Sequence, residues 1–297
     1  MDLIRVGDIE LCTERLGDPA DPPVLLIGGL AGQLISWDDG FCALLVERGL
    51  SVVRFDNRDA GLSTSLDGAP GFDRDVARRR DLSAAAYTLD DMAADAAGLL
   101  GALGIPAAHV VGVSMGGMIA QTLAIAHPER VLSLCSIMST TGAPYVGVPT
   151  AAALGQLLRK PARDRQAYLD GELAAHAVFG SPSYPTPDEE VLARAARKYD
   201  RSYRPAGAGR QMMAVLMAED RTVALGTLAL PTLVVHGGSD HLVSPTGGAA
   251  TVRAIPGATL LTIPGMGHEL PPPVWPQLVE AIVANIGRDS DLRGHTP

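Results

Sequence analysis

Residues 112–116, which read GVSMG, constrain the fold of this chain more than any other segment. They follow an apolar run that predicts a strand and precede an apolar stretch that predicts a helix. A strand that enters a helix through G-x-S-x-G is a nucleophile elbow, in which side chains at the two glycine positions would collide with neighbouring backbone. The turn would hold Ser114 at its tip, beside the N–H of Met115 and the positive end of the helix. We therefore predict that Ser114 is a catalytic nucleophile.

Strand-like and helix-like segments alternate along most of the chain. The expected strands are continuous apolar runs, which is the pattern of strands buried on both faces of a parallel sheet. They lie at 24–27, 52–55, 110–113, 131–137, 233–236 and 260–263, after a half-exposed strand at 9–16. Helices are expected at about 40–49, 88–103, 115–127, 245–255 and 274–287. This alternation predicts an α/β fold with a doubly wound, mostly parallel sheet.

The strand pattern stops between about 141 and 223, where helical patterns dominate. Because the strand pattern resumes at Pro231, an insertion fits this segment better than a separate domain does. We therefore predict one α/β core formed by residues 1–140 and 224–297, with a helical cap at 141–223 inserted between two of its strands.

Three local predictions accompany this division. Residues 65–86 are expected to form a polar loop rich in Arg and Asp. Thr88 is expected to cap the helix that follows, with Asp91 in the first turn. Within the cap, one helix is expected to begin with Thr186 as its N-cap and Pro187 at its first helical position.

Composition and charge argue against several classes of function. The apolar runs are strand-sized and too short to span a membrane, and no signal peptide is recognised, so a cytoplasmic location is expected. A net charge of −9 argues against nucleic-acid binding, which needs clustered Lys and Arg. The three cysteines are scattered and predicted to be buried thiols, so no metal site is expected. No phosphate-loop or dinucleotide fingerprint is present, and no cofactor is expected.

A nucleophilic serine needs a general base and an acid that orients the base. In folds with this elbow, the order along the chain is serine, acid, histidine, each at the carboxyl end of a strand. Asp240 follows the strand-like run near 231–236 through a glycine turn. The loop one strand earlier, at 136–141, contains no carboxylate. Asp240 is therefore the predicted acid.

The predicted base is His268, which lies in a glycine-rich loop immediately after the last expected strand. Two other histidines follow the elbow in the required part of the chain. His241 is adjacent to Asp240, a spacing that makes pairing of the two side chains awkward, and His295 lies in the tail. We therefore predict a triad of Ser114, Asp240 and His268.

The oxyanion of a tetrahedral intermediate needs two hydrogen-bond donors. The Met115 N–H is expected to be one, and the Leu30 N–H, in the glycine-rich loop at 28–32, is expected to be the other. Gly29, in the same loop, and Trp37, which follows it, are candidates for substrate binding. The cap adds three methionines in one helical stretch, whose adaptable side chains would suit a bulky apolar ligand or would pack the cap against the core. These are Met212, Met213 and Met217.

With these residues placed, the chain resembles the α/β-hydrolase superfamily over nearly its whole length. Within it, the resemblance is to an actinobacterial group of serine esterases that includes aclacinomycin methylesterase. The matching stretches are GDPADP at 17–22, FDNRDAGLST at 55–64, VGVSMG at 111–116 and IPGMGH at 263–268. Two positions depart from the usual pattern: Gly28 precedes Gly29 where many relatives have histidine, and Leu62 stands where arginine is usual. Asp56 and Arg58 are interpreted as a structural pair.

The triad predicts a serine carboxylic-ester hydrolase that acts through an acyl-enzyme on a small-molecule ester, as a monomer or homodimer. The resemblance implies a methylesterase acting on a bulky polyketide-type substrate. The same triad would also serve a C–C bond hydrolase, for which cap arginines such as Arg194 and Arg197 would bind an acidic substrate, a lactonase, or a cofactor-free perhydrolase. A non-catalytic ligand receptor on this scaffold is the remaining alternative. Because position 114 is serine, the aspartate-nucleophile routes of epoxide hydrolases and haloalkane dehalogenases are closed.

Overall fold

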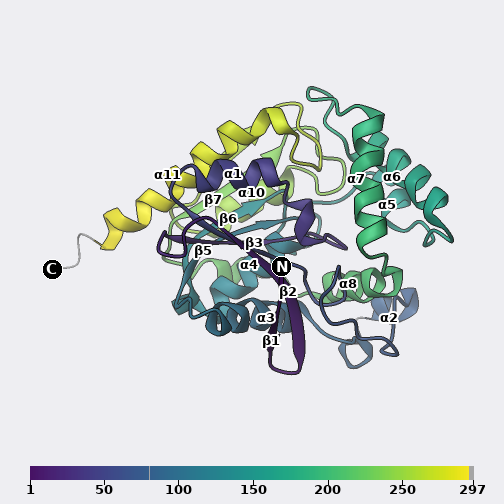
Figure 1. Cartoon of the computed structure of the whole chain (residues 1–297), viewed down its shortest axis with the longest axis horizontal. Coiled ribbons are helices and arrows are strands. Elements are labelled where there is room, and N and C mark those ends of the chain that lie inside the picture. The colour runs from purple at the N-terminus through teal and green to yellow at the C-terminus, as the bar shows by residue number, and fades with distance from the viewer. Residues whose placement is uncertain (80, 294–297) are drawn as a thin grey trace.

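A computed structural model describes residues 1–79 and 81–293 of the chain, and in this part the backbone forms one eight-stranded sheet between two layers of helices (Figure 1). The strand order is β1-β2-β4-β3-β5-β6-β7-β8. Strands β3 to β8 are mutually parallel, while β2 pairs antiparallel with both β1 and β4. The predicted α/β fold with a mostly parallel sheet is thus confirmed. The strands are β1 (Asp2–Val6), β2 (Ile9–Leu16), β3 (Pro23–Ile27), β4 (Ser51–Phe55), β5 (Ala108–Val113), β6 (Val131–Ile137), β7 (Thr232–Gly237) and β8 (Thr259–Ile263).

Helices cover both faces of the sheet. Helices α1 and α11 pack on one face, and α3 and α4 pack on the other (Figure 1). Among the described residues, no helix is long and apolar enough to cross a membrane. The core helices are α1 (Asp39–Val46), α2 (Arg74–Arg79), α3 (Leu89–Ala102), α4 (Met115–Ala126), α10 (Thr246–Ala254) and α11 (Trp275–Arg293).

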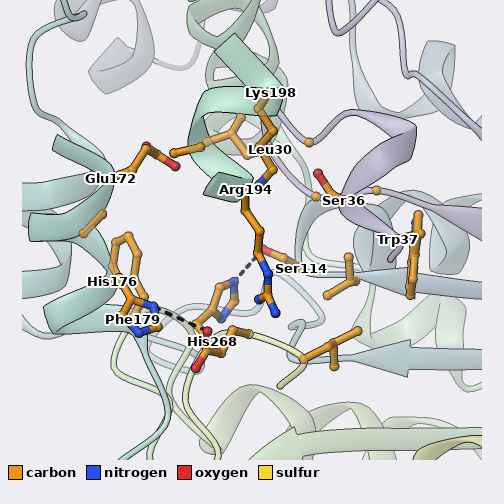
Figure 2. A pocket seen from close by; sticks show the side chains of 18 of the residues that line it. Leu30, Ser36, Trp37, Ser114, Glu172, His176, Phe179, Arg194, Lys198 and His268 are labelled. Carbon is orange, nitrogen blue, oxygen red and sulfur yellow. Dashed lines mark hydrogen bonds and ion pairs between the residues drawn. The ribbon is translucent and has the colours of Figure 1, made fainter. Parts of the chain in front are cut away.

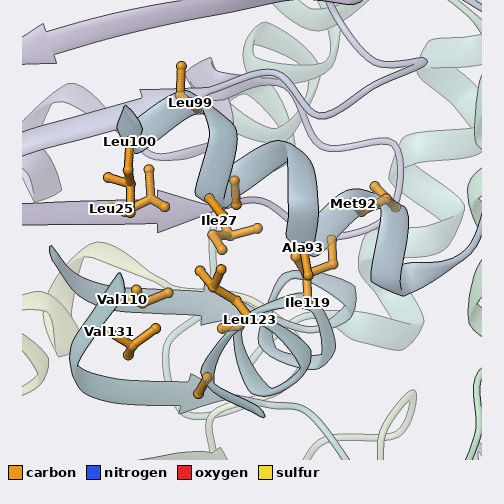
Figure 3. Close-up of a cluster of buried hydrophobic side chains, with 14 of the residues drawn as sticks. Leu25, Ile27, Met92, Ala93, Leu99, Leu100, Val110, Ile119, Leu123 and Val131 are labelled. Atoms are coloured by element: carbon orange, nitrogen blue, oxygen red, sulfur yellow. The ribbon is translucent and has the colours of Figure 1, made fainter. Parts of the chain in front are cut away.

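The continuous apolar strands arise because successive side chains point to opposite faces of a sheet that is covered on both sides. In β3, Val24 and Leu26 are fully buried among side chains of α1 and α11. The alternate residues Leu25 and Ile27 are fully buried on the other face, against α3 and α4 (Figure 3). The central strands β3, β4, β5 and β6 therefore each contribute to two hydrophobic clusters, and this packing fixes their carboxyl ends along one edge.

Between the end of β6 and the start of β7, all residues are described and the chain forms five helices and no strand. Helices α5, α6 and α7 pack together beside the sheet, and α8 lies next to α2 (Figure 1). The division into a core of 1–140 and 224–297 and a cap of 141–223 stays a prediction. The five helices are α5 (Ala151–Leu157), α6 (Arg165–Phe179), α7 (Asp188–Arg201), α8 (Pro205–Met217) and α9 (Thr222–Leu225).

Two arginines, Arg210, which is buried, and Arg201, which is partly buried, join these helices to the loop that follows β4. The Arg210 guanidinium of α8 donates to both carboxylate oxygens of Asp59, at 2.8 and 2.7 Å, and the two side chains are only 3% and 0% exposed. At the end of α7, Arg201 forms an ion pair at 2.8 Å with Asp56, which is also fully buried. The loop after β4 is therefore fixed by charges from the inserted helices.

Asp56 and Arg58, interpreted from the sequence as structural, form ion pairs with different partners and not with each other. Arg58 instead donates to both oxygens of Asp95 in α3, at 2.6 Å each. The Asp56 carboxylate accepts the N–H groups of Leu34 and Leu62, at 2.6 and 2.8 Å, in addition to its pairing with Arg201. The two side chains are anchored in different directions because partners distant in sequence, which a local motif cannot reveal, satisfy each charge.

The local predictions had mixed outcomes. The Thr88 cap is confirmed, since its hydroxyl accepts the N–H of Asp91 and the Asp91 carboxylate accepts the N–H of Thr88. Helix α7 begins one residue later than predicted: Pro187, with an extended ψ of 142°, is the N-cap, and no side chain caps this end. Three acidic residues in the first turn of α7 interact favourably with its positive end instead. The loop expected at 65–86 contains α2, because the Asp73 carboxylate accepts two N–H groups at its start.

Candidate active site

The turn between β5 and α4 holds Ser114 in a left-handed conformation, with φ of 56° and ψ of −119°. Neighbouring backbone leaves no room for side chains on either side of it. A Cβ atom at Gly112 would overlap the carbonyl of Gly116, and a Cβ atom at Gly116 would overlap the carbonyl of Ile27 in β3. The two glycines are therefore sterically required, and the turn exposes the serine hydroxyl above the edge of the sheet.

The three side chains predicted as a triad lie within hydrogen-bond distance of one another. Ser114 follows β5, Asp240 follows β7 and His268 follows β8. The His268 Nε2 atom lies 3.0 Å from the Ser114 hydroxyl oxygen, and its Nδ1 atom lies 2.7 Å from a carboxylate oxygen of Asp240. Because the strands are parallel, their carboxyl ends meet at one edge and bring together residues 154 positions apart in sequence.

The environment of Asp240 keeps this carboxyl group ionised. Burial alone raises its pKa, but contacts with His236 and His268 and a hydrogen bond from the Val243 N–H outweigh burial and hold the pKa well below its ordinary range. The N–H groups of Leu242 and Val243 both donate to the same carboxylate oxygen, at 2.9 Å. A charged Asp240 favours the His268 tautomer with its proton on Nδ1, which leaves Nε2 free to accept a proton from the serine.

His236 is a buried neighbour of this site that the sequence analysis did not single out. Its Nε2 atom lies 2.8 Å from the Val243 carbonyl oxygen and 3.5 Å from a carboxylate oxygen of Asp240. His236 is the last but one residue of β7, and its imidazole thus connects this strand to the loop that carries Asp240. Its place in the sequence, directly before the glycine turn that precedes Asp240, was the only available signal.

The loop that carries Leu30 is held in place by two amide side chains. The Asn57 amide donates to the Gly28 carbonyl at 3.1 Å. The Gln211 amide oxygen, from α8, accepts the N–H of Ala31 at 2.8 Å, and Ala31 has a positive φ of 54°. Gln211 is fully buried, so an inserted helix supports a loop of the core at the position proposed for the oxyanion.

The two N–H groups predicted to stabilise the oxyanion both lie beside Ser114. Leu30 lines the cavity above the serine, and Met115 is the first residue of α4. Within residues 1–79 and 81–293, neither N–H donates to another protein group. A Cβ atom at Gly29 would lie 3.3 Å from the Ser114 Cβ, so the glycine lets this loop approach the serine closely. The role of the Leu30 and Met115 N–H groups as an oxyanion hole remains a prediction.

The inserted helices also hold the loop that carries His268. The His268 N–H donates to the Phe179 carbonyl at the end of α6, at 2.7 Å. The Ser181 hydroxyl accepts the N–H of Gly267 at 3.0 Å, and the Ser181 N–H donates to the Glu269 carboxylate at 2.8 Å. Three consecutive residues of the histidine loop are therefore bound to the segment that ends α6.

A cavity of about 420 Å³ opens above Ser114, between the core loops and helices α5, α6 and α7 (Figure 2). Gly29 and Trp37, both predicted as substrate-binding residues, are part of its lining. The charged side chains of its lining include Glu172 of α6 and three basic residues of α7. The basic residues are Arg194, Arg197 and Lys198.

The methionines predicted to bind substrate do not line this cavity. Met212, Met213 and Met217 are buried within α8, which packs beside the loop after β4 rather than over the serine. A run of apolar residues in a helix shows that one face is buried but not what it packs against, which is why their placement was wrong. Of the other histidines considered, His241 is exposed and His295 lies outside the described residues.

The profile of the α/β hydrolase fold family matches residues 22–271. The chain therefore belongs to this family and is a hydrolase. It is 30% identical to rhodomycin D methylesterase DnrP of Streptomyces peucetius, over 95% of this chain and 97% of that one. It is 29% identical to rhodomycin D methylesterase DauP of Streptomyces sp. strain C5, with the same coverage of both chains. The resemblance to actinobacterial methylesterases inferred from sequence motifs is thus confirmed.

A comparison with solved structures shows a similar fold. The enol-lactonase of Burkholderia xenovorans LB400 superposes with a TM-score of 0.73, and the match covers 95% of this chain and 98% of the lactonase. The two sequences are 21% identical, so this similarity concerns the arrangement of the backbone alone.

Proposed function

We propose that this protein is a serine carboxylic-ester hydrolase. The observation that carries the proposal is the hydrogen-bonded chain from Ser114 through His268 to Asp240, with separations of 3.0 and 2.7 Å. This arrangement matches the requirement for a nucleophile, a general base and an orienting carboxylate in acyl transfer.

The reaction proceeds in two halves. The Ser114 oxygen attacks the ester carbonyl carbon as its proton passes to His268 Nε2, and the resulting oxyanion accepts hydrogen bonds from the Leu30 and Met115 N–H groups. The ester C–O bond then breaks, and His268 returns the proton to the leaving alcohol. A water molecule attacks the acyl-enzyme with the same help from His268, which releases the acid and restores the serine. Asp240 stabilises the imidazolium at both stages.

We further propose that the substrate is the methyl ester of a bulky, polycyclic acid. The support comes from the two relatives named as rhodomycin D methylesterases, which match nearly the whole chain. A cavity of about 420 Å³ is within the usual range for sites that enclose a drug-sized ligand.

The test compares wild-type protein with Ser114→Ala on two sets of esters. The first set is p-nitrophenyl esters from acetate to decanoate, and the second is methyl esters of anthraquinone carboxylic acids. We expect turnover by the wild type and a loss of at least about 10⁴-fold in Ser114→Ala. Full activity of Ser114→Ala on esters would refute the mechanism. Binding of the polycyclic ester by calorimetry without any turnover would favour the receptor alternative.

A further inference from the structure

Helix α7 presents a basic face to the cavity. Arg194, Arg197 and Lys198 are spaced so that they share one side of the helix, and all three line the cavity above Ser114. Figure 2 shows Arg194 and Lys198. Arg197 is exposed, whereas Arg194 and Lys198 are partly buried. The last arginine of α7, Arg201, is taken up by its ion pair with Asp56. The basic residues of α7 that face a ligand are thus the three that line the cavity.

Lys198 has no direct counter-charge. In the described part of the chain, its ammonium makes no hydrogen bond or ion pair, although its backbone carbonyl accepts the amide of Gln33. Glu172 faces it from α6, but that carboxylate is paired with Arg159 at 2.6 Å. Burial lowers the pKa of Lys198, Glu172 opposes this effect, and Arg194 and Arg197 lower the pKa further. A ligand with a negative charge would supply the missing partner.

The other acids of the cavity lining are engaged elsewhere. Glu269 accepts the N–H of Ser181 at 2.8 Å and lies 3.5 Å from the His176 imidazole. Asp38 accepts the N–H of Gly40 at 2.9 Å as the cap of α1. Neither carboxylate is paired with a base of α7, so among the described lining residues only Glu172, itself paired with Arg159, offsets the charge of the basic face.

Arg194 is placed to share a ligand with Lys198. Its guanidinium extends from α7 toward the Ser114–His268 pair in Figure 2. It forms an ion pair with Glu190 one turn earlier in the helix, and the two side chains are 27% and 46% exposed. Exposed pairs of this kind contribute little to stability, so a ligand can replace Glu190 at small cost. A guanidinium also binds a carboxylate through two parallel hydrogen bonds.

We propose that Lys198 and Arg194 form a subsite for a negatively charged oxygen on the acid portion of the substrate. This inference rests on the proposed function, because it assumes that the cavity holds the acid portion of an ester cleaved at Ser114. The substrate is then an ester whose acid portion carries a second acidic group, either a carboxylate or an acidic phenol.

The kinetic test uses esters that differ only in charge. Monomethyl esters of the dicarboxylic acids from adipic to sebacic are compared with their neutral half-amides and with methyl esters of matching ω-amino acids. A second pair tests whether a phenolate can take the place of the carboxylate. It consists of the methyl ester of a hydroxyanthraquinone carboxylic acid and the same ester with its phenol converted to a methyl ether, both assayed above the pKa of the phenol. For one chain length or for the phenolate, we expect kcat/KM for the anion to exceed that for its neutral match by about 10-fold to 100-fold, mainly through KM.

Variants locate this preference. The chain contains only two lysines, Lys160 and Lys198, and Lys160 is an exposed residue outside the cavity lining. Lys198→Met should bring the ratio of anionic to neutral turnover close to one, and Arg194→Met should lower it. Lys160→Met is the matched control and should leave the ratio unchanged. A ratio near one in the wild type for every matched pair, or a ratio unaffected by Lys198→Met, would overturn the subsite.

A binding measurement separates failure of the subsite from failure of the esterase proposal. Reductive methylation of Ser114→Ala with isotope-labelled formaldehyde gives one NMR signal for each lysine, and Lys160→Met assigns them. We expect the anionic ester to shift the Lys198 signal saturably while the half-amide does not. A Lys198 signal that does not respond to either anion refutes the subsite even if esters are hydrolysed. A saturable shift without any hydrolysis by the wild type supports the subsite and counts against the esterase.

Discussion

Replacing Arg210 by methionine tests the buried ion pair that joins α8 to the loop after β4. Asp59 has a fully buried side chain, and its carboxylate accepts two hydrogen bonds from Arg210 and one, at 2.9 Å, from the Leu66 N–H. In Arg210→Met, the Leu66 bond and a long hydrogen bond from the Ser65 hydroxyl, at 3.5 Å, are left to compensate a buried negative charge. Methionine retains much of the apolar volume of the arginine side chain, so the change removes chiefly the charge and the hydrogen bonds.

The expected cost follows from the burial of both partners. Removing one member of a buried ion pair destabilises a protein by about 3–5 kcal/mol, because the other charge is left uncompensated. At about 2–4 °C per kcal/mol for a domain of this size class, the melting temperature should fall by roughly 6–20 °C. The matched control is Arg165→Met. Arg165 contacts Asp200 with similar geometry, at 2.8 and 2.9 Å, but both side chains are about half exposed, so little change is expected.

The pH dependence gives a second, independent measurement. Burial raises the pKa of Asp59, but the bonds from Arg210 and Leu66 lower it by more, so the folded-state pKa lies below the unfolded value of about 3.9. The stability that the wild type gains from this pair is therefore present above the unfolded pKa and is lost as the pH falls through the folded pKa. In Arg210→Met, burial dominates and raises the pKa of Asp59. As the pH falls, protonation of Asp59 then removes the uncompensated charge and reduces the loss of stability in the variant.

The difference in unfolding free energy between the two proteins should accordingly be largest near neutral pH and should shrink toward pH ~4 and below. Denaturant unfolding across this range, with wild type, Arg210→Met, Asp59→Asn and the double variant, measures both the loss and the coupling. The double variant should recover part of the loss, because neither charge then remains. A loss below about 1 kcal/mol at neutral pH, or a loss that does not change with pH, would refute the reasoning.

Three further predictions concern catalysis. Asp240→Asn should lower kcat by about 10⁴-fold with little change in the fold, because His268 loses the carboxylate that sets its tautomer; a loss below tenfold in ester hydrolysis would contradict this. Gln211→Ala should lower kcat by about tenfold without loss of folded protein, because the Ala31 N–H loses its acceptor; unchanged kcat in the same assay would show that the support is dispensable. Gly112→Ala should give protein that does not fold cooperatively, as followed by circular dichroism, and a normal melting transition would show that the turn has more room than the structure allows.

The sequence predicts well those features that depend on local pattern and on order along the chain. The strands with two buried faces, the tight turn at Ser114 and the loops that carry Asp240 and His268 follow from apolar runs, glycines and chain order. In the structure, those three side chains lie within hydrogen-bond distance. Parallel strands explain this proximity, since they bring the ends of successive strands to the same edge whatever the loops contain.

Features that depend on which helix face meets which surface could not be predicted in this way. The methionines of α8 and the basic residues of α7 both have helical spacing, but only the latter line the cavity. The partner of Asp56 likewise lies in a helix that follows it by more than a hundred residues. Contacts of this kind are decided by tertiary packing, and no spacing within a single segment encodes them.

The support that α6 and α8 give to the catalytic loops has a consequence for how a substrate reaches the serine. A hinge that swung all the inserted helices outward together would break the bond from His268 to Phe179 and the bond from Ala31 to Gln211, and would disassemble the catalytic geometry at each opening. Among the described residues, the first turns of α6 make no such bond to the loops that carry Leu30, Asp240 and His268. The start of α5 does make one, because its N-cap residue Thr150 donates its N–H to the carbonyl of His241, beside Asp240, at 2.9 Å. Access is therefore expected through movement of the start of α6, so that the enzyme can admit a large ligand and remain ready to react. For the same reason, a graft that exchanges specificity between relatives should replace the start of α6 and retain α8 and the N-cap of α5.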